Sequence, residues 1–343
     1  MGSPRKVEMV LSYQNYIENP PATPKQLYGN ACASDRITID SWLKTWCENV
    51  KACHAKFKSF KDHSVGKLFN INKHKPAFVI GSGPSLGYNG AKIKDRDGIL
   101  AISALHNFHF FEDRDVDIDY YVSLDAGKVV LEEVSEGGSK TEQEYWDRTK
   151  NKKLIAFIGS PIELFNKWQG EVYLFNAPVP DQKYIQTVTE CEPYHMFVSN
   201  GGNVLGGCLY IAKAIFGSNP VAFMGADFSF GYDQGNGIKF HSWNSKYDAN
   251  MGTVMRGVDV YGNKVLTWNS YFGFKNFTEY VTLTVPGLYI NCTEGGMLGA
   301  YPEGNLMSIK QMPVDDFLMM YNMNEGIKDA CLNPEVFTNK ILY

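Results

Sequence analysis

Short apolar segments recur along the middle of the chain and alternate with stretches of helix-like composition. Six of them lie at residues 77–81, 99–103, 120–125, 154–159, 172–176 and 221–227. Each is apolar almost throughout, instead of alternating between apolar and polar positions, which is typical of strands buried on both faces of a parallel sheet. The repeated order of strand, loop, helix and strand predicts an α/β fold with an open sheet.

Helical periodicity is clearest in two other stretches. Between residue 35 and about residue 61, apolar side chains recur at steps of three and four, at Ile39, Trp42, Leu43, Trp46, Val50 and Phe57. Residues 203–216 have the composition of a buried helix, and Gly217 is suited to end it. The breakers Asn19-Pro20-Pro21 and Thr23-Pro24 predict an extended or poorly ordered arm at residues 1–30.

These patterns predict three parts. Residues 1–74 form an arm and a small helical region, and residues 313–343 form a helical tail. Residues 75–312 between them form a Rossmann-like domain with an open, mainly parallel sheet and helices on both faces. Ligands of such sheets bind at the carboxyl ends of the strands, so the loops after those ends are where functional residues are expected.

Charge is distributed unevenly over the 343 residues. The net charge of −4 argues against a protein that coats nucleic acid. Residues 1–75 nevertheless hold 12 Lys and Arg against 6 Asp and Glu, and four of these lysines lie on one face of the expected helix: Lys51, Lys56, Lys58 and Lys61. They form either a solvated helix face or a contact for a phosphate-bearing partner. A nucleic-acid partner is therefore disfavoured but stays open.

Cysteine usage and hydropathy predict a cytoplasmic protein without a membrane span. The seven cysteines show no CxxC pair and lie scattered in apolar segments, which is typical of reduced, buried thiols. No apolar run approaches the ~18 residues that a spanning helix needs. The first twenty residues also lack the apolar core of a signal peptide.

The strongest local motif follows the first expected strand, at Gly81, Ser82, Gly83, Pro84 and Ser85. Glycine permits a left-handed backbone and a close approach to a ligand, and proline is suited to the first position of a helix. Free backbone N–H groups at such a helix start favour a phosphate, and the two serines add hydroxyl donors. The motif therefore indicates either a nucleotide phosphate site or only a tight turn.

Two further segments carry polar groups at expected strand or helix ends. Asp125 closes the third strand and is suited to hold Mg²⁺, to bind a ribose hydroxyl or to cap a following helix. Asn200, Gly201, Gly202 and Asn203 precede the apolar helix. They either initiate that helix or form a second wall of a nucleotide pocket.

Candidate catalytic groups lie later in the chain. Asp227 ends the sixth strand, and His241 follows in a loop rich in Gly, Asp and Asn. A loop imidazole beside a strand-end carboxylate is a candidate general base whose tautomer the carboxylate sets, although a lone loop histidine is more often incidental. Asn291 and Glu294 lie at a glycine turn after another strand-like stretch, and we expect them to bind the substrate.

Several familiar sites are excluded. The Gly-Lys-Ser/Thr of a P-loop is absent, and the strand that would supply the ribose-binding acid of an NAD site ends at Ser103-Ala104. Neither a GxSxG elbow, nor HExxH, nor zinc-ligand spacing of Cys and His is present. The alternating acids between Asp113 and Asp119 lack the glycine and glutamate of a calcium loop. We therefore expect neither NAD nor zinc.

Taken in order, the motifs resemble one family, which comprises the MptE-like 6-hydroxymethylpterin diphosphokinases and the motility accessory factor (Maf) flagellin glycosyltransferases. The matches run through residues 81–86, 103–125, 199–203, 225–228, His241, 291–296 and Gly299. The opening motif also resembles bacterial sialyltransferases that use CMP-activated sugars. The resemblance implies that residues 81–85, Ser103 and Asp125 line a nucleotide site and that Asp227 and His241 lie near the reacting centre. The family's usual Pro-Asp before the third strand is Ile118-Asp119 here.

The resemblance implies a nucleotide-dependent transferase. The favoured hypothesis is a glycosyltransferase that uses a CMP-activated sugar, because the N-terminal layout is closer to Maf-type chains; its acceptor is a small molecule, a glycan or a protein. The alternative is a diphosphokinase that passes pyrophosphate from Mg-ATP to a pterin, with Asp125 and Asp227 holding the metal. A non-catalytic nucleotide-binding module is the second alternative.

Overall fold

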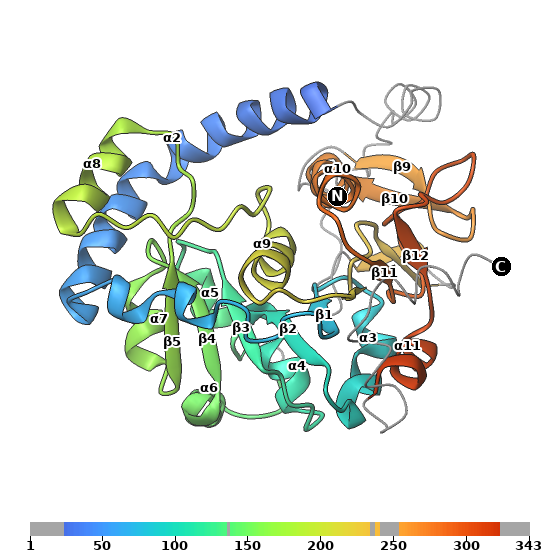
Figure 1. The fold of residues 1–343 in the computed structure, drawn as a ribbon, viewed down its shortest axis with the longest axis horizontal. Coiled ribbons are helices and arrows are strands. Elements are labelled where there is room, and N and C mark those ends of the chain that lie inside the picture. Colours follow the sequence, from blue (N-terminus) through green and yellow to red (C-terminus); the bar gives the residue numbers. More distant parts are fainter. Residues whose placement is uncertain (1–23, 136–137, 234–236, 241–253, 323–343) are drawn as a thin grey trace, which may run out of the picture.

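The structure of the chain, a computed structural model, is built around a central sheet of eight parallel strands (Figure 1). The structure describes residues 24–135, 138–233, 237–240 and 254–322. The strands are β1 (Ala77–Ile80), β2 (Leu100–Ala104), β3 (Tyr120–Ser123), β4 (Lys153–Phe157), β5 (Glu171–Phe175), β6 (Val221–Met224), β11 (Tyr289–Asn291) and β12 (Ile309–Gln311). Their order in the sheet is β12-β11-β6-β1-β2-β3-β4-β5, and every neighbouring pair is parallel. The predicted parallel α/β sheet is confirmed.

Helices cover both faces of this sheet. The α-helices are α2 (Pro24–Phe57), α3 (Leu86–Asn89), α4 (Phe108–Glu112), α5 (Val129–Glu133), α6 (Glu142–Arg148), α7 (Ile162–Lys167), α8 (Gln182–Cys191), α9 (Val204–Tyr210), α10 (Asn269–Thr284) and α11 (Val314–Tyr321). Successive residues of a strand point to opposite faces. Accordingly, Tyr120 of β3 contacts Phe216, just after the helix that continues α9, whereas Tyr121 contacts Phe108 of α4.

Residues 203–217 fold as the sequence predicts. Asn203 caps the start of α9, a π-helical turn continues it over Ile211–Ile215, and Gly217 follows with a φ of +74°. A left-handed backbone at this position ends the helix, and glycine adopts it at low cost. The six apolar segments of the sequence likewise each contain a strand.

Other elements differ from the sequence prediction. Helix α2 begins at Pro24, inside the stretch expected to be an arm, and residues 1–23 lie outside the described residues. Strand β12 and helix α10 were not anticipated. Neither were two small antiparallel pairs, β7 (Gly231–Asp233) with β8 (Gly237–Phe240) and β9 (Val254–Val258) with β10 (Lys264–Trp268).

One hydrophobic core joins the three expected parts of the chain. It contains Val50 of α2, the strand residues of the central sheet, and Phe317 of α11, whose ring lies 4.9 Å from that of Phe78 on β1. The boundaries at residues 74/75 and 312/313 stay predictions, but they do not separate independent cores.

Two compositional expectations concern the cysteines and the helices. In the described part, Cys47, Cys53, Cys208 and Cys292 are buried free thiols, and Cys191 is a half-buried one. Burial raises the pKa of the Cys208 thiol well above its usual range, so the neutral form is favoured. None of the helices in the described ranges has both the length and the apolar content needed to cross a bilayer.

Helix α2 is attached to the carboxyl ends of two strands through one side chain. The Asn49 amide donates to the carbonyl of Ala126, which follows β3, at 3.2 Å and to that of Gly159, which follows β4, at 2.8 Å. One turn earlier, the Trp46 ring packs edge-on against Phe157 of β4 at 6.4 Å. The N-terminal helix is therefore part of the edge on which the candidate site lies.

We expect Asn49→Ala to lower the free energy of unfolding by about 1–3 kcal/mol, because two buried carbonyl groups lose their donor. Urea unfolding measures the change. The control is Lys51→Ala on the exposed side of the same helix, which we expect to alter stability little. Equal stability of the two variants would show that Asn49 does not hold α2 to the sheet.

Candidate functional site

The strand order places one reversal point in the sheet. After β1 the chain builds β2 to β5 on one side, and it then returns to add β6, β11 and β12 on the other. In open α/β sheets, ligands bind at the carboxyl ends of the strands beside such a reversal. The loops that leave β1 and β6, at residues 81–85 and 225–227, meet there, and they carry the motif and the carboxylate that the sequence singled out.

Backbone contacts hold these two loops together. The Gly81 N–H donates to the Met224 carbonyl and the Gly83 N–H to the Gly225 carbonyl, both at 2.8 Å. A Cβ on Gly81 would lie 2.6 Å from the Gly225 oxygen, and one on Gly225 would lie 2.5 Å from the Gly81 oxygen. Gly225 also has a φ of +57°. Glycine is required here because the two backbones touch.

Asp227 is the buried carboxylate of this site. It is 7% exposed, and it accepts hydrogen bonds from the Ser85 hydroxyl at 2.7 Å and from the Ser85 N–H at 3.2 Å. Burial raises its pKa from 3.8 to about 7, and the bonds from Ser85 oppose this rise. Asp227 thus joins the two loops and can exchange a proton near neutral pH.

The glycine motif differs from its expected form in two respects. Neither Gly81 nor Gly83 has a positive φ, and the helix after Pro84 is the single turn of α3. The N–H groups of Gly83 and Ser85, expected to be free for a phosphate, are bonded to the β6 loop. Within the described ranges, Ser82 is the residue of this motif whose amide and hydroxyl both bond no other residue, so it is the available donor.

A third loop, which follows β11, packs against the backbone of Asp227. A Cβ on Gly296, which has a φ of +70°, would lie 2.5 Å from the Asp227 Cα. The Met297 N–H donates to the Asp227 carbonyl at 2.7 Å, and the Ala226 N–H donates to the Thr293 hydroxyl at 3.2 Å. The glycine turn that the sequence assigned to the substrate is therefore a support for Asp227.

The expected substrate-binding residues are engaged in internal contacts. Asn291 is 1% exposed, and its amide donates to Gln311 of β12 at 2.9 Å. Glu294 pairs with Lys92 at 3.0 Å and accepts the Val314 N–H at the start of α11. These bonds fix β11, β12 and α11, and a substrate role for Asn291 and Glu294 stays a prediction.

Ser103 also lies deeper than expected. It has no exposed surface, and its hydroxyl accepts a bond from the Asn107 amide at 3.0 Å. The same amide donates to the Gly81 carbonyl at 2.9 Å. Asn107, which the sequence analysis missed, therefore links the β2 loop to the glycine motif. Its place directly after the second strand was the one available signal.

Asp125 leaves β3 at the same edge. Its carboxylate accepts the Gly127 N–H at 2.8 Å, which is a turn contact and not a cap on α5. Burial raises its pKa. The Trp42 ring of α2 lies against Gly127, where a Cβ would be 3.1 Å from it. The described residues contain no cluster of three His, Cys, Asp or Glu side chains arranged for a metal.

The residues before α9 act first as a helix start. The Asn203 side chain accepts the Gly206 N–H at 2.9 Å, and the Asn200 side chain accepts the Gly202 N–H at 2.8 Å. Gly201 and Gly202 both have a positive φ. The first turn of α9 also reaches the glycine motif, because a Cβ on Gly81 would lie 3.3 Å from the Leu205 side chain.

One predicted residue, the candidate general base, is not part of the described structure. His241 is outside the described residues, so its position relative to Asp227 stays a prediction.

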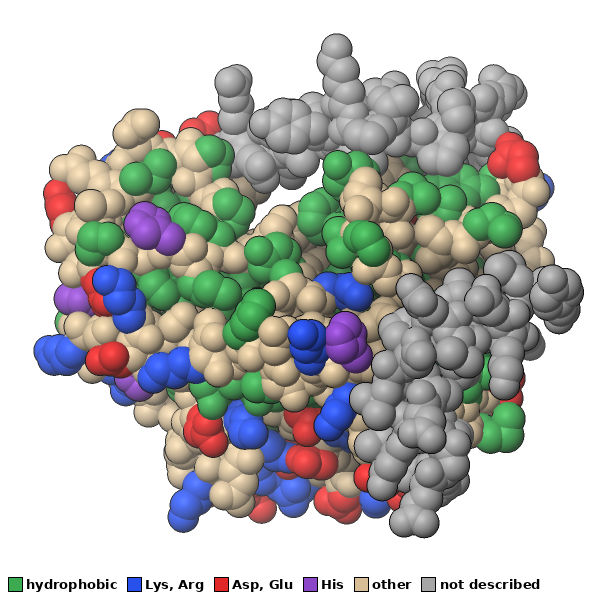
Figure 2. Space-filling view, viewed as in Figure 1, with side chains coloured by type: hydrophobic (Ala, Val, Ile, Leu, Met, Phe, Trp, Pro, Cys, Tyr) green, Lys and Arg blue, Asp and Glu red, His purple; other side chains and the backbone are tan. Residues whose placement is uncertain are grey.

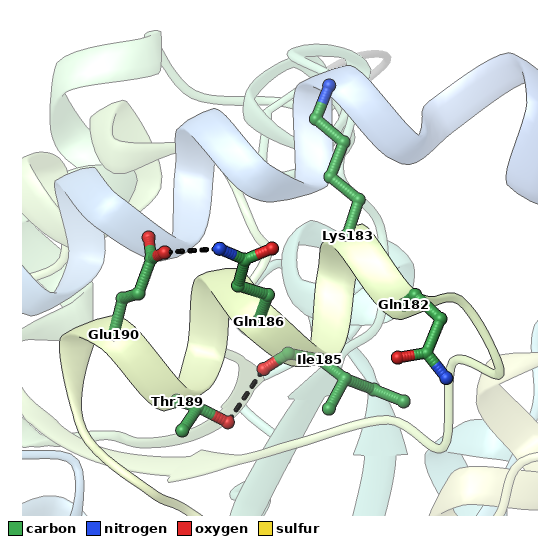
Figure 3. A pocket seen from close by; sticks show the side chains of 6 residues that line it. All are labelled: Gln182, Lys183, Ile185, Gln186, Thr189 and Glu190. Atoms are coloured by element: carbon green, nitrogen blue, oxygen red, sulfur yellow. Dashed lines mark hydrogen bonds between the residues drawn. The ribbon is translucent and has the colours of Figure 1, made fainter.

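Two surface hollows, of about 720 Å³ and 230 Å³, lie along α8 at the far end of the sheet. The larger is formed by outward-pointing side chains of that single helix, where Gln186 bonds Glu190 at 2.7 Å (Figure 3). Neither hollow includes a residue of the candidate site.

Comparison with known proteins agrees with this arrangement. The family model described as "6-hydroxymethylpterin diphosphokinase MptE-like" matches residues 51–233, which is more than half of the chain. The chain belongs to the MptE-like family. The match begins inside α2 and ends in β7, so it covers β1 to β6 and both loops of the reversal point.

The MptE-like chain also has a similar solved structure, the Maf glycosyltransferase from Magnetospirillum magneticum AMB-1. The two superpose with a TM-score of 0.50 at 13% sequence identity, over 80% of this chain and 40% of the other. At this identity the likeness concerns the fold, and this chain spans less than half of the larger protein. No curated protein matches the chain by sequence.

We expect Gly83→Ala to lower the free energy of unfolding by about 1–3 kcal/mol, because the new methyl group overpacks the loop contact. Its Cβ would lie 2.1 Å from the Asp227 Oδ2. In the matched control Gly273→Ala on α10, the new Cβ meets no atom within 4 Å, and stability should stay equal or rise by up to about 1 kcal/mol. Equal stability of Gly83→Ala and wild type would contradict the close contact.

We expect Asp227→Asn to remove a pH dependence of stability. The folded pKa of about 7 exceeds the unfolded value of 3.8, so the folded state holds an extra proton between these limits. The extra proton adds roughly 4 kcal/mol to the free energy of unfolding below about pH 4, and this stabilisation is lost as the pH rises to about 7. Urea unfolding of wild type and variant between pH 4 and 9 measures the difference, and parallel profiles would contradict it.

Proposed function

We propose that this chain is a nucleotide-dependent transferase whose donor binds at the reversal point of the sheet and whose proton-transfer group is Asp227. The observation that carries the proposal is the buried carboxylate itself. It lies at the carboxyl edge between β1 and β6, and its pKa of about 7 suits proton exchange at neutral pH. The diphosphokinase in the family's description and the glycosyltransferase of the similar structure are both transferases, which supports this reaction class.

Within this class, we favour glycosyl transfer from a CMP-activated sugar. The acceptor hydroxyl attacks the anomeric carbon, the bond from that carbon to the phosphate oxygen breaks, and CMP leaves with the electron pair. The hydroxyl proton passes to Asp227, whose Oδ2 is held by the Ser85 hydroxyl. A base with a pKa near the working pH is the most effective for this step. Ser82 is the donor in the motif available to the phosphate.

The alternative is pyrophosphate transfer from Mg-ATP to a pterin hydroxymethyl group. The family's description favours it. In that reaction Asp125 and Asp227 would face the metal as ionised ligands. The raised pKa of both carboxyl groups and the two Ser85 bonds to Asp227 suit this role less well than proton transfer. A non-catalytic nucleotide-binding module is the remaining alternative.

Ligand binding tests the position of the donor site. Thermal shift and calorimetry with CMP, CTP, ATP, GTP and UDP, each with and without Mg²⁺, identify the nucleotide; a ligand at 100 times its Kd stabilises by about 2.7 kcal/mol. We expect Ser82→Leu to abolish this binding, because it removes a donor and fills the approach to the motif. The control Ser139→Leu lies in the loop before α6, where Ser139 bonds Asp113, and should bind like wild type. Unchanged binding by Ser82→Leu would place the nucleotide elsewhere.

Turnover tests the role of Asp227. We expect Asp227→Asn to lower kcat by about 10²–10⁴-fold with little change in nucleotide affinity, and to lose the rise of kcat through about pH 7 that the wild type shows. Release of CMP from a CMP-sugar measures glycosyl transfer, and a strict need for Mg-ATP and a pterin would instead show the kinase. A variant rate within a few-fold of wild type, with the pH profile kept, would leave Asp227 only its structural role.

A further inference from the structure

A basic segment runs from the last turns of α2 to the start of β1. Residues 51–75 contain one acid, Asp62, and seven lysines, which are all exposed: Lys51, Lys56, Lys58, Lys61, Lys67, Lys73 and Lys75. Its last part, residues 69–76, leads into the amino end of β1. It therefore lies on the edge of the sheet opposite to Asp227.

Hydrogen bonds fix the backbone of this last part. The N–H groups of Asn70, Asn72 and His74 donate to the carbonyls of residues 215, 216 and 217 at 2.7, 3.0 and 2.9 Å. The buried Asn72 amide also donates to the Ser218 hydroxyl at 2.9 Å. Asn70 and His74 are held at a φ of +61°, which costs energy in residues other than glycine. The side chains between these anchors are therefore presented in a fixed direction.

Two of the side chains presented there are large and apolar. Phe69 is 62% exposed and Ile71 is 44% exposed, and Lys67 and Lys73 flank the pair in the sequence. A second exposed apolar pair, Leu283 and Val285, precedes the amino end of β11.

Asn219 connects the two apolar pairs across the edge of the sheet. Its N–H donates to the Lys75 carbonyl at 2.9 Å, and its side chain accepts the Leu288 N–H at 2.8 Å. Residues 69–76, 211–220 and 281–288 therefore form one surface, which we call the amino-edge face. It combines lysines with exposed apolar side chains.

No acidic side chain belongs to the amino-edge face, since its three segments contain no Asp or Glu. Of the acids before the neighbouring strands, Asp119 pairs with Arg96 at 3.0 Å, Asp117 pairs with Lys152 at 2.8 Å, and Glu171 accepts the Tyr173 hydroxyl at 2.6 Å. Asp95 and Asp97, which precede β2, are exposed. In Figure 1 the segment before β1 crosses the near side of the molecule, and Figure 2 shows Lys and His side chains beside hydrophobic ones at the middle of that view.

We propose that the amino-edge face docks on the surface of an anionic lipid bilayer. Lysines near such a surface are attracted to its acidic headgroups, and exposed apolar side chains enter the boundary between headgroups and acyl chains. The aliphatic Ile71 and Leu283 favour lipid over nucleic acid, because a phosphate backbone offers them no partner. Docking by this edge leaves the carboxyl edge, with Asp227, open to solvent.

Vesicle sedimentation tests the proposal with the full chain. We expect binding to vesicles of phosphatidylcholine containing about one third phosphatidylglycerol, little binding to pure phosphatidylcholine, and loss of most binding at about 1 M salt, where the Debye length falls to about 3 Å. Lys73→Gln with Lys75→Gln should weaken binding about 25-fold, or about fivefold for each charge. Phe69→Ser with Ile71→Ser should weaken it without changing its dependence on salt.

Matched controls separate the face from general charge and hydrophobicity. Lys183→Gln and Ile185→Ser, both on α8, should bind vesicles like wild type. Ile185→Ser removes a 49% exposed apolar side chain. Equal weakening by these controls would overturn the proposal, as would equal binding to neutral and anionic vesicles. Tight binding to single-stranded RNA or duplex DNA that the Phe69/Ile71 variant retains would overturn it in favour of nucleic acid.

Discussion

The contact between the loops that leave β1 and β6 is the constraint on which the rest of the site depends. Gly81 and Gly225 approach so closely that neither tolerates a Cβ without movement. This contact places Ser85 within bonding distance of Asp227 and keeps the carboxyl group out of water. Burial then gives Asp227 its pKa near 7, so a packing requirement of the backbone produces the acid–base property of the side chain.

Three other loops stabilise this arrangement from different sides. In the β2 loop, Asn107 donates a hydrogen bond to the Gly81 carbonyl, and in the β11 loop the Thr293 hydroxyl accepts the Ala226 N–H. In the first turn of α9, the Leu205 side chain lies beside Gly81. None of these three residues takes part in the proposed chemistry. Each contacts a residue of the two central loops and helps to hold it in place. The site is therefore a property of the whole carboxyl edge and not of one motif.

The sequence predicted the sheet well and the site only in part. Runs such as residues 77–81 and 221–227 were recognisable because a strand buried on both faces must be apolar throughout. Short elements such as β12, with three residues, carry too little pattern to be recognised. The helix start at Asn203 was visible from its capping chemistry.

The roles of polar residues were harder to predict, because they depend on partners distant in sequence. Glu294 and Asn291 have the composition of a binding loop, but Lys92 and Gln311 take up their polar groups. Glycine has the same ambiguity. Gly83 was assigned to phosphate approach, and it is needed in any case because the Asp227 carboxylate occupies the space where a Cβ would lie.

The pairing of β1 with β6 has a consequence for how the chain folds. Ala77 pairs with Val221, far along the sequence, so β1 remains an edge strand until most of the sheet has been made. Contacts of such long sequence separation form slowly, and an unpaired apolar strand edge is a template for association with other chains. During synthesis, β1 therefore keeps an unpaired edge until β6 has been made, and the site becomes complete only when the strands β6 and β11 are in place.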